Sequence, residues 1–109
     1  MSAFTDFEKA VVAGVPALAK GALKDFATQA QSDARSFLRQ AKEGLRRWTR
    51  ELRDHELTKA EFADLVKGQK DLAELAALTQ AGLALAALQR FRDGLMRLVI
   101  DTAFKTFLP

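Results

Sequence analysis

The chain has 109 residues, the length of one domain, and 49% of them are hydrophobic. It contains no cysteine, which excludes a disulfide framework, a thiol nucleophile and a thiolate metal site. The formal net charge is +3, and all the excess positive charge lies in residues 1–54, which hold ten Lys and Arg against seven Asp and Glu. Ala, Leu, Lys, Arg, Glu and Gln fill most positions, so we expect an all-α protein rather than a β protein.

Large apolar residues recur every eleven positions along most of the chain. In the first half the series is Phe4, Val15, Phe26, Phe37 and Trp48. Eleven residues make three helical turns at about 3.67 residues per turn, so such helices keep one apolar face over long distances. The repeat predicts long helices with a hendecad-like, or eleven-residue, pattern of core positions.

The first half is expected to form a short helix over about residues 3–13 and a long helix over about residues 16–54. Gly14 precedes Val15 and Pro16. Pro16 has no amide hydrogen and disfavours helix at the residue before it. We therefore expect a kink or break near Gly14 to Pro16, with Pro16 in the first turn of the long helix.

A tight turn is predicted over residues 54–58, near the middle of the chain. Thr58 and Glu61 have the spacing of a capping box, in which each side chain bonds the other residue's backbone amide. Leu57 and Phe62 stand at the positions of a hydrophobic staple. The second long helix is expected over about residues 59–107, where the glycines at positions 68, 82 and 94 favour a bend because each costs about 1 kcal/mol relative to Ala.

These elements predict one domain, residues 1–109, folded as an antiparallel helical hairpin about 75 Å long. From Leu72 to Leu88 the second helix is apolar on almost every side, so one partner helix leaves much of it uncovered. We therefore expect self-association of coiled-coil type, most simply two hairpins in a four-helix bundle. The candidate oligomer interface comprises Leu75, Leu78, Leu85, Leu88, Met96, Ile100, Phe104 and Phe107.

Basic side chains recur on one face of the first long helix. At 100° per residue they fall within about 80° of one another and extend over about 27 Å. We call this set the basic stripe; its members are Arg35, Arg39, Lys42, Arg46, Arg50 and Arg53. A row of cations at this spacing suits the phosphates of nucleic acid or of an anionic membrane surface, and it is also typical of a solvated helix face.

No motif indicates catalysis, a metal or a cofactor. His55 and Glu56 begin the pattern of a zinc protease, but Lys59 stands where the second histidine is needed. The chain has one histidine, which also excludes the paired Glu-x-x-His motifs of di-iron bundles. We therefore expect a protein that is not an enzyme.

The leading functional hypothesis is a self-associating interaction or scaffold protein, a homo-oligomer with a further protein partner left open. One alternative is nucleic-acid binding through the basic stripe. A second is a membrane-surface protein, because eleven-residue amphipathic units resemble those of exchangeable lipid-binding proteins and Phe104 and Phe107 suit a lipid interface. The first nine residues carry Asp6 and Glu8 rather than an export signal, so a cytoplasmic location is expected.

Overall fold

The computed structural model describes residues 2–19 and 21–109, and within them the fold is all-α. The helical elements follow one another in the order α1 (Ala3–Leu18), η1 (Gly21–Phe26), α2 (Ala27–Gln40), α3 (Lys42–Arg53), α4 (Lys59–Lys67), η2 (Lys70–Leu72), α5 (Ala76–Gln80) and α6 (Leu85–Phe107). The elements η1 and η2 are 3₁₀ helices.

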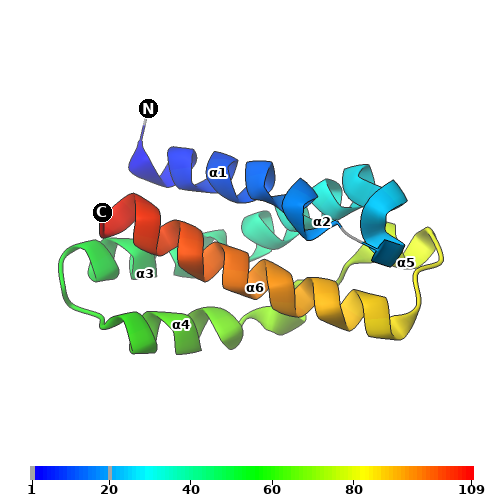
Figure 1. Cartoon of the computed structure of the whole chain (residues 1–109). Coiled ribbons are helices and arrows are strands. Elements are labelled where there is room, and N and C mark those ends of the chain that lie inside the picture. The colour runs from blue at the N-terminus through cyan, green and yellow to red at the C-terminus, as the bar shows by residue number, and fades with distance from the viewer. Residues whose placement is uncertain (1, 20) are drawn as a thin grey trace.

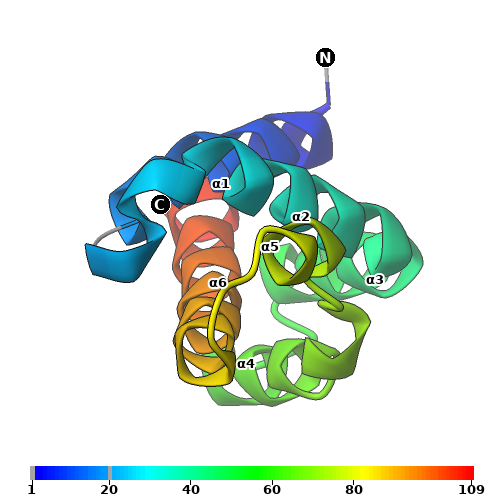
Figure 2. The same cartoon turned by 90° about the vertical axis from the view of Figure 1, so that its right-hand side faces the viewer.

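The chain crosses the molecule four times (Figure 1). α1 makes the first pass, α2 and α3 the second, α4 and α5 the third, and α6 the fourth. The 54–58 turn lies at the same end as both chain termini, and α5 lies at the other end with the start of α6 (Figures 1 and 2). Such back-and-forth packing lets short connections join neighbouring antiparallel segments.

α6 is the central element, because it packs against α1, α3, α4 and η2. Its buried side chains include Phe91, Leu95 and Val99, all at most 2% exposed. The core continues to the end of the molecule that holds both termini, where the Phe7 and Phe107 rings lie 5.8 Å apart. Hydrophobic burial along α6 therefore ties the first and last helices of the chain together.

The predicted turn and the start of the helix after it are confirmed. α4 begins at Lys59, and Thr58 Oγ1 accepts a hydrogen bond from the Glu61 amide at 3.1 Å. In return, the Thr58 amide donates to Glu61 Oε1 at 2.9 Å. Leu57 is half-buried against the core and Phe62 is fully buried, as a staple requires.

The first half differs from the expectation at Pro16. α1 runs through Gly14 and Pro16 and ends at Leu18, two residues beyond the proline. The expected helix 16–54 is divided among the end of α1, η1, α2 and α3, and Lys20 within it lies outside the described residues. Helix α1 tolerates the proline because the carbonyl that loses its partner finds another donor, as argued below.

The second half is also divided rather than continuous. α4 ends at Lys67, with Gly68 as its C-cap. α5 starts after Leu75, which lies in the left-handed region at φ 56°, and Gly82 at φ 91° lies in the connection before α6. A continuous hairpin about 75 Å long and an uninterrupted eleven-residue repeat are not confirmed, since the Cα atoms span 42 Å in their longest direction. The sequence suggested a four-helix bundle to which each of two chains contributes one hairpin. Instead, four antiparallel segments come from a single chain.

Candidate anion-binding surface on α2 and α3

All six residues of the basic stripe are exposed. Arg35 and Arg39 come from α2, and the other four come from α3. α2 and α3 each pack one face on the core, where Phe37 and Leu45 are buried. The stripe lies on the other face of these helices and stays exposed. The stripe is therefore accessible along its length.

Ala41 joins α2 to α3 and keeps the two helices nearly in line. Its amide donates to the Phe37 carbonyl at 2.9 Å, and its carbonyl accepts from the Leu45 amide at 2.9 Å. Both are the i to i−4 bonds of an α-helix, so the boundary at Ala41 interrupts the helix only slightly. The basic residues on the two sides of Ala41 consequently stay on one face.

One residue of the stripe has an acidic partner. Arg53 Nε lies 3.1 Å from Asp54 Oδ1, and both side chains are about half exposed. This hydrogen bond holds the pKa of the Asp54 carboxyl below its ordinary value and raises the pKa of Arg53. In the described part of the chain the other five stripe residues form no ion pair with a carboxylate, so their charge is available to a ligand.

Arg46 lies over an aromatic ring from another helix. Its guanidinium carbon is 5.3 Å from the centre of the Phe4 ring, near the start of α1. A cation at this distance is attracted to the face of the ring. The contact fixes Arg46 close to α1, which runs alongside the stripe.

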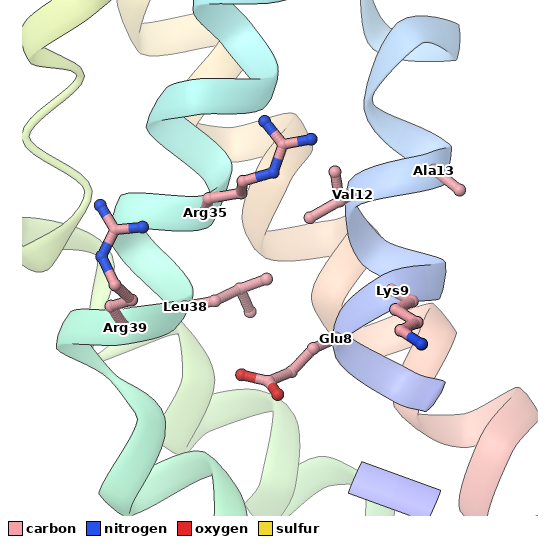
Figure 3. Close-up of a pocket in the computed structure, with 7 residues that line it drawn as sticks. All are labelled: Glu8, Lys9, Val12, Ala13, Arg35, Leu38 and Arg39. Atoms are coloured by element: carbon pink, nitrogen blue, oxygen red, sulfur yellow. The ribbon is translucent and has the colours of Figure 1, made fainter. Parts of the chain in front are cut away.

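α1 and α2 enclose a groove at one end of the stripe (Figure 3). The groove has a volume of about 460 Å³ and is lined by Glu8, Lys9, Val12, Ala13, Arg35, Leu38 and Arg39. A second hollow of about 390 Å³ lies further along and shares Arg39 with the first. The sequence indicated the α2 wall through the basic stripe, but no local signal indicated which residues of α1 would face it.

The candidate oligomer interface is mostly buried within the single chain. Leu75, Leu78, Leu88, Met96, Ile100 and Phe107 are each at most 9% exposed. Phe104 is half-buried beside the Phe62 ring at 6.0 Å, with Lys59 Nζ over its face. Leu85 is different, because it is 69% exposed.

We also searched the described residues for a metal site and a membrane-spanning helix, and compared the chain with known proteins. They contain no group of three or more His, Cys, Asp or Glu side chains placed to hold a metal ion. None of the described helices combines the length and the apolarity needed to cross a membrane. Comparison with protein-family models, curated proteins and solved structures finds no significant match, so function is inferred from the geometry of the surface.

Proposed function

We propose that this protein is a non-enzymatic binding protein that holds nucleic acid on the basic stripe of α2 and α3. The observation that supports the proposal is the exposure of all six stripe residues along two consecutive helices that helix-type hydrogen bonds join at Ala41. Lys and Arg side chains bind nucleic acid by neutralising backbone phosphates and releasing counterions. A row of cations of which, among the described residues, only Arg53 forms an ion pair fits this role better than a face of alternating charges does.

Arg39, Arg46 and Arg50 are the residues expected to contact phosphates most directly. Helical spacing places them on the same side, they lie one or two turns apart, and none of them forms an ion pair within the described residues. Phosphate contacts set the position of the ligand but carry no base information. We therefore expect binding that does not depend on base sequence and weakens as salt rises.

The test is fluorescence anisotropy with a labelled DNA duplex and a labelled single strand, each in two base sequences and over a series of salt concentrations. The variant replaces all three residues, as Arg39→Gln/Arg46→Gln/Arg50→Gln. The matched control, Arg90→Gln/Arg97→Gln/Lys105→Gln, changes the net charge equally at exposed positions of α6. Circular dichroism establishes that both variants keep the fold.

Loss of three phosphate contacts is expected to reduce the salt slope of duplex binding by roughly 0.9 log units of affinity per log unit of salt for each contact. The affinity should fall equally for both base sequences, and the α6 control should bind like the wild type. Absence of binding at low salt would overturn the proposal, and so would equal losses in the two triple variants. Equal binding of the wild type to anionic vesicles would assign the stripe to a membrane surface instead.

Self-association is a second candidate, because one specific observation favours it. Residues 75–89 carry no charged side chain, and Leu85 within them is the large apolar residue that stands out as exposed in the described chain. It lies at the start of α6, at the end of the molecule where α5 also lies (Figure 2). We propose that a scaffold function would use this end of the molecule rather than the long sides of the helices.

A further inference from the structure

The groove between α1 and α2 combines apolar side chains with cationic ones, Arg35 and Arg39 on α2 and Lys9 on α1. Val12 is half-buried and Ala13 is exposed, so both present hydrocarbon to the groove, while Leu38, at 3% exposed, lies beneath them as part of the core. Its volume of about 460 Å³ falls within the range of small-molecule sites, which are mostly apolar with a few placed polar groups. The groove therefore suits a ligand with an apolar body.

Arg35 and Arg39 stand one helical turn apart on the α2 wall. In the described part of the chain neither side chain makes an ion pair or a hydrogen bond. In Figure 3 the side chain of Arg35 extends from α2 toward Val12 on α1. The Arg39 side chain lies on the side of α2 that faces away from Val12 (Figure 3). A guanidinium offers a planar fork of N–H donors that matches a carboxylate or a phosphate, so Arg35 is the residue placed to hold an anionic group in the groove.

Glu8 places a negative charge in the groove, away from the positive charge of Arg35. It projects from α1 into the groove near Leu38, away from the guanidinium of Arg35 (Figure 3). A second negative charge on a ligand would meet this carboxylate in a partly apolar space, where like charges repel more strongly than in water. Inside the groove, the arrangement favours a ligand with one anionic head, directed toward Arg35, over a ligand with two.

We propose that this groove binds an amphipathic monoanion, a carboxylate with an unbranched apolar chain. The carboxylate binds the fork of Arg35, Arg39 adds positive charge one turn away, and the apolar chain lies along Val12 and Ala13 above the buried Leu38. The proposal goes beyond nucleic-acid binding, because it uses the α2 end of the basic stripe together with apolar side chains that phosphates do not need. It shares Arg39 with the proposed nucleic-acid surface, but octanoate binding is measured without nucleic acid, so the two proposals can fail separately.

The test uses octanoate below its critical micelle concentration, followed by heteronuclear NMR of the full chain. Octanoate is expected to shift amide signals of α1 and α2 near residues 8–13 and 35–39. Butyrate, which has the same head and a shorter chain, should bind at least about tenfold more weakly, since it buries fewer CH₂ groups. Octanamide, which has the chain without the charge, should lose about as much affinity.

Two double variants distinguish an effect specific to the groove from an effect of net charge. Arg35→Gln/Arg39→Gln should lower the octanoate affinity by about tenfold or more, because charge-assisted hydrogen bonds are lost. Arg46→Gln/Arg50→Gln removes the same charge from α3 and should leave octanoate binding unchanged. Equal losses in the two variants, absence of any shift with octanoate, or inorganic phosphate binding as tightly as octanoate would each overturn the proposal.

Discussion

Gln31 on α2 donates a hydrogen bond from Nε2 to the backbone carbonyl of Val12 on α1 at 3.3 Å. In an uninterrupted helix this carbonyl would accept from the amide of residue 16, four positions later. Pro16 has no amide hydrogen, so it leaves the Val12 carbonyl without its helical donor. The Gln31 side chain supplies the missing bond from another helix, which explains how α1 continues past a proline.

We predict that the cost of removing Gln31 depends on Pro16. Gln31→Met removes the donor at similar length and should lower the free energy of unfolding by about 1 kcal/mol. In a Pro16→Ala background the restored amide can serve the Val12 carbonyl, so the same change should cost less. Urea denaturation of the two single variants and the double variant measures this coupling. Strictly additive effects would contradict it.

Asp33 illustrates the same kind of long-range compensation at the start of α5. The residue before this helix, Leu75, has no polar side chain to cap it. Instead the two carboxylate oxygens of Asp33, which is 5% exposed, accept hydrogen bonds from the amides of Ala77 and Leu78, both at 2.9 Å. These are the second and third residues of α5, where a capping side chain normally bonds. The negative charge also suits the positive end of the helix dipole.

Asp33→Ala should therefore lower the free energy of unfolding by about 2–4 kcal/mol, because it leaves two amides unpaired in or near the core. Asp33→Asn should cost less, since the amide oxygen can still accept one of the bonds. Asp25→Ala, at an exposed position of η1, is the matched control and should change stability little. The measurement is the urea midpoint of each variant, and equal shifts for the two alanine variants would refute the role given to Asp33.

Two helical glycines are predicted to respond differently to alanine. A Cβ at Gly94 in α6 would lie 3.6 Å from Leu18 Cδ2, an ordinary contact, whereas a Cβ at Gly14 in α1 would lie 2.8 Å from Leu98 Cδ1. Gly94→Ala should raise the unfolding free energy by up to about 1 kcal/mol through helix propensity. Gly14→Ala should gain little, because Leu98 must leave its rotamer at a cost of about 0.5–1.5 kcal/mol. Thermal unfolding ranks the two variants, and the reverse order would be evidence against the close approach of α1 to α6.

The capping box of α4 makes a prediction about pH. The Thr58 backbone amide, and then its hydroxyl group, hold the pKa of the Glu61 carboxyl below its ordinary value. A carboxyl with a lowered folded-state pKa stabilises the fold above its unfolded-state pKa, and the contribution disappears as pH falls through the folded-state value. NMR titration should find a depressed pKa for Glu61, and Thr58→Ala should bring it back toward the ordinary value. Thr28→Ala, at an exposed position of α2, should leave the titration of Glu61 unaffected.

The features that sequence predicted correctly depend on neighbours in the chain. The capping box lies within four residues, so Thr58 and Glu61 suffice to predict where α4 begins. The basic stripe follows from helical spacing, since residues on the face opposite Phe37 and Leu45 must be exposed if those two are buried. The sequence also indicated a bend at Gly82. This residue has a positive φ and lies in the connection between α5 and α6.

The features that sequence missed depend on residues far apart. Leu75 disfavours a left-handed conformation, and its φ of 56° precedes a helix that Asp33 caps from more than forty residues away. Pro16 signalled a break, yet α1 continues to Leu18, and the carbonyl that Pro16 leaves without a donor accepts a bond from Gln31 on another helix. The α1 wall of the groove was missed for the same reason: no local pattern shows that Val12 would lie opposite Leu38.

Leu85 offers the sharpest test of self-association, because it is exposed within the single chain. Leu85→Asp should leave the circular dichroism and the unfolding free energy of a monomer nearly unchanged, since no core contact is lost. If the uncharged end of the molecule pairs with a second copy, the same change would bury an unpaired charge in the interface and dissociate it. Sedimentation equilibrium over a range of protein concentrations distinguishes the cases. We expect the average mass of the wild type to rise with protein concentration and the variant to remain a monomer. A wild type that stays monomeric at every concentration would contradict self-association through this end of the molecule.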